Sequence, residues 1–268
     1  MSDSILSDQL WQRIEPLLPK PKKRRNVQHS GRKPSDPRKV MTGIVFALKT
    51  GVPWKNLPAT SDFPSGHTCR RRLLEWHARG VWRRLWQNIL SELQARGRLS
   101  WGRAVVDSSS VRAGHGGEKT GKSPVDRAKL GSKHHLLVEG HGIPLSASLT
   151  GANRHDITQL LHLVERIPPV RGKRGRPRQK PDKVQGDRAY DSEPHRRVLR
   201  KKGIEPVLAK RRTPHGSGLG KTRWVVERSL SWLHQFRKLR MREETSSTTH
   251  EALMLLACAI IAHRYLKR

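Results

Sequence analysis

The chain has 268 residues and a formal net charge of +33, because 55 Lys and Arg stand against 22 Asp and Glu. This balance predicts a polyanionic partner, and nucleic acid is the first candidate because Lys and Arg release counterions from phosphates. The most apolar run, at 252–261, is too short to cross a membrane and predicts a buried helix. We therefore expect no membrane partner and, without a secretory signal, a protein of the bacterial cytoplasm that associates with the nucleoid.

Residues 1–95 are expected to form a helical DNA-binding region. The first helix has Ser7 as its N-cap candidate and stops at Pro19, and the second runs from Asp36 to Gly51. A short turn then leads to a third helix, and such a pair predicts a helix-turn-helix-like unit. The candidate DNA contacts of this third helix are Arg70, Arg71 and Arg72. The alternative is an ordinary helical bundle with a solvated basic face.

Residues 96–268 change pattern and predict a mixed sheet with helices, of the α+β or α/β class. Strands are expected at 103–113, 134–140, 144–152, 182–191 and 204–210, and helices at 157–167, 193–203 and 222–240. This order is compatible with a ribonuclease-H-like core. A basic loop at 170–183 carries Arg174 and Arg176, which suit a narrow A·T minor groove, although contact with the DNA backbone alone is the simpler alternative.

Three acids are candidates for chemistry. Asp107 ends an apolar strand, and Asp187 follows a shorter one. Because catalytic groups of α/β sheets collect at the carboxyl ends of strands, these two acids are expected to share divalent cations, for which Mg²⁺ is well suited. Glu227 lies on the 222–240 helix, opposite its apolar face, where it meets solvent or lines a cleft.

The stripe that holds Glu227 also contains Arg223, His234 and Lys238. Arg223 stands one turn before Glu227, where it can pair with the carboxylate or contact a phosphate. Spacing does not decide between the three acids and their competitors for a metal site. Those competitors are Asp126, Asp156, Asp182 and Asp191.

Several long motifs in one order carry a family resemblance. They include "GRKPSDPRKVMTGIVFALKTGVPWKNLP", "VVDSSSVRA", "GANRHD", "GDRAYDS" and "RWVVERSLSWLHQFRKLRMR". With them, nearly the whole chain resembles the bacterial insertion-sequence transposases of the DDE type, close to the insertion sequence 5 family. The resemblance implies a ribonuclease-H-like catalytic core at 96–268 that cuts DNA and transfers strands.

The same resemblance assigns roles to residues. It implies that Asp107, Asp187 and Glu227 bind two Mg²⁺ ions, with Mn²⁺ as a substitute, and that Arg223 is the arginine before the glutamate. Gly220 stands where the family has a tyrosine, and His234 where it has a basic residue. Further contacts to DNA phosphates are expected from Lys133 and Lys238.

The implied partner is double-stranded DNA, both the terminal inverted repeats of the element and the target. Holding two ends implies a homodimer or a larger assembly on DNA. Three alternatives stay open at this stage: a metal-dependent nuclease without strand transfer, a catalytically silent DNA-binding protein derived from a transposase, and an RNA-binding protein. The last is disfavoured because 3 Phe and 2 Tyr offer few stacking platforms.

Overall fold

The computed structural model describes residues 5–20, 33–58, 60, 62–212 and 220–267. Its first part is helical, as expected. The helices are α2 (Asp8–Ile14), η1 (Glu15–Leu17), α3 (Pro37–Thr50), η2 (Trp54–Asn56), α4 (Gly66–Ala78) and α5 (Val81–Ala95). Ser7 caps α2, Asp36 caps α3 through the amide of Arg38, and Gly51 ends α3 with a φ of 77°, a left-handed conformation that glycine adopts without a steric cost. These three predicted boundaries are confirmed.

The connection between α3 and α4 differs from the short turn that we expected. It runs from residue 51 to residue 65 and contains η2, whereas a helix-turn-helix turn has about three or four residues. The reason is local packing: Trp54 of η2 is buried, and its carbonyl oxygen lies against Gly66 at the start of α4.

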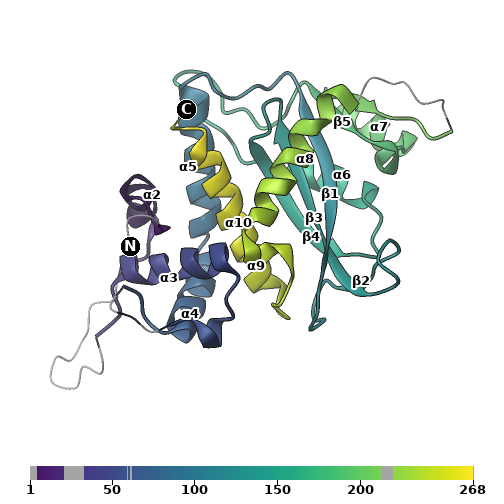
Figure 1. Cartoon of the computed structure of the whole chain (residues 1–268). Helices are drawn as coiled ribbons and strands as arrows, with labels where there is room; N and C mark the ends of the chain where they lie inside the picture. The colour runs from purple at the N-terminus through teal and green to yellow at the C-terminus, as the bar shows by residue number, and fades with distance from the viewer. Residues whose placement is uncertain (1–4, 21–32, 59, 61, 213–219, 268) are drawn as a thin grey trace.

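The second part contains a six-stranded mixed sheet (Figure 1). Its strands are β1 (Ala104–Arg112), β2 (Gly121–Lys122), β3 (Leu130–Glu139), β4 (Pro144–Gly151), β5 (Lys183–Gly186) and β6 (Glu205–Leu208). β3 pairs antiparallel with β1, β2 and β4, while β5 pairs parallel with β1 and β6. Three long antiparallel strands followed by two parallel ones, with helices between, make this a ribonuclease-H-like core.

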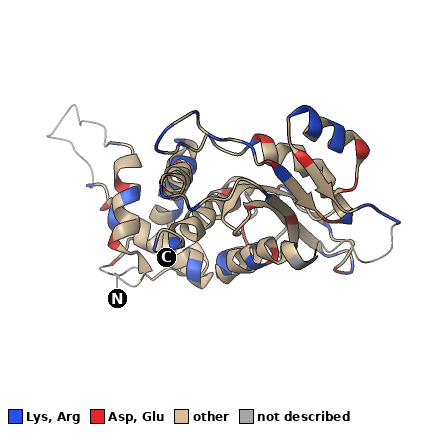
Figure 2. Cartoon of the chain, turned by 90° about the horizontal axis from the view of Figure 1, so that it is seen from above, with Lys and Arg blue, Asp and Glu red and all other residues tan. Residues whose placement is uncertain are grey.

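Helices cover both faces of the sheet (Figures 1 and 2). They are α6 (Ile157–Glu165), η3 (Arg188–Tyr190), α7 (Glu193–Lys201), α8 (Gly220–Gln235), α9 (Arg237–Arg240) and α10 (Ser247–Arg264). α8 crosses β1 and β3, and α6 packs on β3 and β4. α10 lies between α5 and β4 and is buried on nearly all sides, as its apolar sequence predicts.

One hydrophobic core extends from Leu6 to Leu266 and passes through α5, α10 and the sheet. The core is therefore continuous across residue 95, where the chain changes from helix to strand, and the division into 1–95 and 96–268 stays a prediction. Lys and Arg are spread over many helices and loops, with few acids among them (Figure 2). Within the described residues, no helix is both long and apolar enough to span a membrane.

Candidate active site

The sheet register places two of the predicted acids side by side. β1 and β5 are parallel, with Ala104 opposite Val184 and Val105 opposite Gln185. The same offset, continued along both strands, sets Asp107 beside Asp187. Asp187 directly follows the end of β5, whereas Asp107 lies inside β1, which continues to Arg112, so the expectation that Asp107 ends a strand is wrong. Both carboxylates lie beside the carboxyl end of β5, the kind of position where ligands of α/β sheets bind.

Each of these aspartates has one carboxylate oxygen fixed by the backbone. Asp107 Oδ1 accepts a hydrogen bond of 2.8 Å from the backbone amide of Ser108, and Asp187 Oδ1 accepts one of 2.9 Å from the backbone amide of Ala189. The two Oδ2 atoms face α8 instead. This arrangement fixes the side-chain rotamers and leaves one oxygen of each acid for a cation.

Arg223 of α8 brings the three acids together. Its Nη2 lies 3.2 Å from Asp107 Oδ2, 3.8 Å from Asp187 Oδ2 and 4.0 Å from Glu227 Oε1. The start of α8 is tied to β5 by a hydrogen bond of 2.7 Å from Gln185 to Thr222. Arg223 Nε is also buried and has no partner among the described residues, so the guanidinium has an unused donor at this site.

Exposure increases across the three carboxylates. The side chains of Asp107, Asp187 and Glu227 are 17%, 34% and 61% exposed. A cleft of about 590 Å³ opens between β1 and α8, lined by Asp107, Glu227, His234 and Arg240 among others. The exposure of the three carboxylates thus increases from the sheet toward an open cleft that a large substrate can enter.

Burial shapes the electrostatics. It raises the pKa of the Asp107 carboxyl, an effect that Asp187 reinforces and that the Ser108 amide and Arg223 oppose. Burial also raises the pKa of Tyr190, whose hydroxyl lies near the acids, and lowers the pKa of His234, with Arg240 contributing. At neutral pH, His234 is therefore a neutral imidazole.

The competing acids are engaged elsewhere. Asp126 pairs with Arg112 at 2.7 Å, Asp182 with Arg178 at 2.8 Å, and Asp191 with Arg196. Asp156 lies on the other face of β1, where its Oδ1 accepts hydrogen bonds from Ser108 Oγ and Lys133 Nζ at 2.8 and 3.0 Å. Sequence spacing could not distinguish these four acids from the three candidates for the metal site. Their hydrogen-bond and ion-pair partners in the structure do distinguish them.

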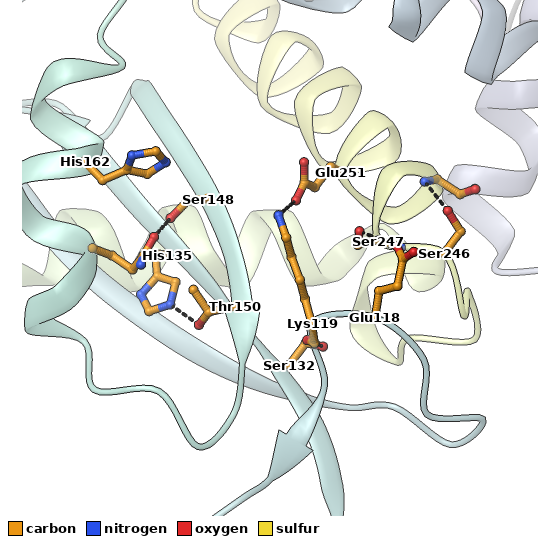
Figure 3. A network of polar contacts seen from close by, with 12 residues as sticks. Glu118, Lys119, Ser132, His135, Ser148, Thr150, His162, Ser246, Ser247 and Glu251 are labelled. Atoms are coloured by element: carbon orange, nitrogen blue, oxygen red, sulfur yellow. Dashed lines mark hydrogen bonds and ion pairs between the residues drawn. The ribbon is translucent and has the colours of Figure 1, made fainter.

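Asp156 is a neighbour of the site that the sequence offered only as a competitor. Together with Lys133 it forms a polar layer behind Asp107, and His135 Nδ1 lies 3.7 Å from the same Asp156 oxygen. His135 in turn bonds Thr150 of β4 at 2.8 Å, as Figure 3 shows. Alternation along β1, which sends Asp107 and Ser108 to opposite faces, is the signal that could have located this layer.

Lys238 is the clearest correction among the predicted DNA contacts. Its side chain is 2% exposed, and Nζ bonds Val52 O at 3.2 Å and Glu243 at 2.8 Å, with Glu244 at 3.5 Å. The prediction extended α8 to residue 240, but the helix breaks at Phe236, whose ψ of 99° is extended. The break turns Lys238 inward, so the predicted contact with a phosphate is wrong.

The other predicted DNA contacts have mixed surroundings. Arg71, Arg174 and Arg176 are exposed. Three further candidates have partners within the protein: Arg70 bonds Thr249, Arg72 bonds Glu75, and Lys133 is 13% exposed and bonds Arg154 O and Asp156. Contact of these residues with DNA stays a prediction.

The donor set fits a divalent metal. Hard carboxylate oxygens that converge on one cationic group are the ligands that Mg²⁺ and Mn²⁺ prefer. Among the described residues, no three acid or histidine side chains are already gathered as a metal cluster, because the Arg223 guanidinium stands between the acids. Asp107, Asp187 and Glu227 are the residues that could hold the ions.

Comparison with known families decides the classification. A family model described as "Transposase DDE domain" matches residues 102–262, which contain all three acids. The chain belongs to the DDE transposase family. A second model, described as "Putative transposase of IS4/5 family", matches residues 6–86 of this family member.

Relatives of this transposase-family chain come from other insertion elements. It is 58% identical over 166 residues, 62% of this chain and 77% of the relative, to "Putative transposase for insertion sequence element IS402" of Burkholderia cepacia. It is 31% identical over 117 residues, 40% of this chain and 37% of the relative, to "Transposase for insertion sequence element IS1106" of Neisseria meningitidis serogroup B.

Solved structures are more distant. A Mos1 mariner paired-end complex with Mn matches over 96% of this chain and 87% of that one, at 11% identity and a TM-score of 0.27. A simian T-cell lymphotropic virus intasome matches over 58% of this chain and 48% of that one, at 16% identity and a TM-score of 0.34. At these scores the likeness carries no argument, and the fold assignment rests on the sheet topology and the family model.

Proposed function

We propose that this chain is the transposase of its insertion sequence, which binds the terminal inverted repeats and catalyses Mg²⁺-dependent strand cleavage and strand transfer. The observation that carries the proposal is the convergence of Asp107, Asp187 and Glu227 on one guanidinium at the mouth of an open cleft. The net charge of +33 supports a DNA substrate.

The residues of the site would have different roles in metal binding and in binding of the phosphate. Asp107 and Asp187, each fixed through Oδ1, would hold the ions with Oδ2, and Glu227 would complete the set from α8. Bound Mg²⁺ would activate the attacking water or 3′-hydroxyl and stabilise the leaving oxygen. Arg223 offers donors, including its unpartnered Nε, to a phosphate oxygen. His234 lines the cleft as a neutral group, so it supplies no charge to the phosphate.

The test compares wild type with Asp187→Asn on DNA that carries the element's ends, with Mg²⁺. Asparagine keeps the shape but weakens the metal ligand, so we expect cleavage and strand transfer to fall at least about a thousandfold while DNA binding persists. Asp182→Asn is the matched control, since Asp182 is an exposed acid at the other end of β5 and pairs with Arg178. Pre-cut ends with a target plasmid separate cutting from joining.

Each outcome has a distinct meaning. Cleavage by Asp187→Asn at the wild-type rate would show that the acids are misassigned. Cleavage without joining by the wild type would support a nuclease, and DNA binding without either reaction would support a silent DNA-binding protein. Two copies on a pair of ends are also expected, and the mass of the protein–DNA complex in solution measures this.

A further inference from the structure

A groove continues from the acidic cleft along β1. The first hollow is lined by Asp107, Ser109 and Arg240 among others, and a second, of about 790 Å³, is lined by Ser110 and the same Arg240. Because the two hollows share Arg240 and consecutive residues of β1, they form one path, called here the β1 groove. Its lining residues lead from the acids along β1, beside α9, to Asp126 and Leu130, which lie between β2 and β3 and at the start of β3.

The break after α8 gives this groove its charge. Arg237 and Arg240 of α9 are exposed and have no acid partner among the described residues, while Lys238 and Leu239 between them are buried. The buried Lys238 pairs with Glu243 and Glu244 and neutralises the acids of this segment. The positive charges of Arg237 and Arg240 are therefore left at the surface. The second hollow is lined by one acid, Asp126, which is already paired with Arg112.

The segments around the groove are held in place by a residue next to its lining. Arg242, 1% exposed, donates to the carbonyl of Lys119 at 3.1 Å and to Ser132 Oγ at 2.7 Å, and its amide bonds Arg112 O at 2.7 Å. The segment before β2 is tied to α10 by Lys119 to Glu251 and by Glu118 to Ser247, as Figure 3 shows. α9, β1 and β2 therefore present their outer side chains in a fixed arrangement.

The groove also gathers apolar side chains that face solvent. Val125, Leu130 and Met241 line it and are 82%, 46% and 49% exposed, which makes them three of the four strongly exposed large hydrophobic residues in the described part of the chain. Exposed apolar groups among unpaired arginines suit the sugar faces and the minor groove of DNA, where such side chains contact or wedge base steps.

We propose that the β1 groove binds the duplex next to the scissile phosphate, with Arg237 and Arg240 on its phosphates. This inference rests on the proposed function, because the groove begins at the acids that would cut. From Asp107 to Arg112 the strand rises about 17 Å, at about 3.4 Å a residue. At about 3.4 Å a base pair, the groove spans about five base pairs.

The test uses the Arg237→Gln/Arg240→Gln double variant and fluorescence anisotropy without divalent metal. The probes are a duplex of the element's end that stops ten base pairs short of the cleavage point, and two longer duplexes that extend it up to the cleavage point or ten base pairs past it. On the longest duplex, the double variant should bind roughly tenfold more weakly than wild type, and the slope of log K against log salt should fall by about two, for two lost phosphate contacts. On the shortest duplex it should match wild type.

The control is Arg197→Gln/Lys201→Gln on α7, which removes the same charge from the opposite face of the sheet and should show no dependence on the extension. Equal losses in both double variants, or losses that ignore the extension, would overturn the groove. A change of self-association in sedimentation, without a change in DNA binding, would assign it to a second copy of the chain. If wild type binds no duplex at all, the proposed function fails with it.

Discussion

Arg223 occupies the position that cations would need, so its removal should tighten metal binding in the absence of DNA. Its Nη2 is within 3.2 to 4.0 Å of three carboxylate oxygens, and the same oxygens are the candidate metal ligands. Arg223→Gln keeps much of the length and a hydrogen-bond donor but removes the positive charge. A metal ion then no longer has to displace the guanidinium.

The magnitude follows from the distances. Two unit charges 4 Å apart attract by about 4 kcal/mol at an effective dielectric constant of 20. The desolvation of Asp107 and the solvent around Glu227, 61% exposed, offset most of this gross attraction. A net contribution of about 1–2 kcal/mol remains, and since 1.4 kcal/mol corresponds to tenfold in affinity, Mn²⁺ and Mg²⁺ should bind roughly tenfold more tightly to the variant.

The assay is titration calorimetry with Mg²⁺ and electron paramagnetic resonance with Mn²⁺, both without DNA. A second readout is thermal unfolding: metal-free Arg223→Gln should melt below wild type, because three acids lose their shared cation, and Mg²⁺ should restore it more than it stabilises wild type. Arg228→Gln is the control, since Arg228 lies on the same helix but stacks on Trp224 and Trp232. Unchanged or weaker metal binding by Arg223→Gln would refute this reasoning.

Three further predictions concern the scaffold. Lys238→Met leaves the buried Glu244 and the partly exposed Glu243 without their cation and should lower the free energy of unfolding in urea by about 3–5 kcal/mol; an unchanged midpoint would contradict the buried position. Burial lowers the pKa of His250 from 6.5 to about 3, so below pH 6.5 the unfolded state binds a proton that the native state does not bind, and this residue alone should lower stability by about 2 kcal/mol by pH 5. His250→Asn should remove that part of the pH dependence in denaturation curves, whereas the part from His134 and His135, whose pKa values burial also lowers, should remain. Gly66→Ala would place a Cβ 1.8 Å from a backbone oxygen and should lose about 3 kcal/mol or more in thermal unfolding, while Gly102→Ala, with open space around it, should be neutral.

Local signals were sufficient for most of the fold. Caps and glycines located the start of α2 and both ends of α3, and alternating or apolar runs located β1, β3, β4, β5 and β6. The first helix was expected to stop at Pro19, whereas α2 ends at Ile14 and a 3-10 turn follows to Leu17. Apolar runs also indicated Asp107 and Asp187, because the position of an acid after such a run can be read from the sequence. Asp187 does follow the end of β5, whereas Asp107 lies within β1, which continues to Arg112. Helical phase placed Glu227 away from the helix's own core contact, and the structure gives it a 61% exposed side chain.

The errors arose where tertiary contacts override local pattern. The 222–240 segment has unbroken helical periodicity, yet Phe236 packs into the core and ends α8. The chain changes direction at this break. The side chain of Lys238 is therefore buried, and those of Arg237 and Arg240 are exposed to solvent. The contacts of Asp156 could not be predicted either. Its partners Ser108 and Lys133 lie on β1 and β3, and the pairing of these two strands cannot be read from the sequence.

The position of α10 has a consequence for synthesis of the protein. α5 ends at Ala95, but much of its buried face rests on α10, which begins at Ser247. During translation the N-terminal helices therefore emerge long before the surface that completes their core, and contacts of such large sequence separation form slowly. We expect the nascent chain to depend on chaperones until residue 264 has left the ribosome, and α4, which carries Arg70 to Arg72, to reach its final packing against α10 only then.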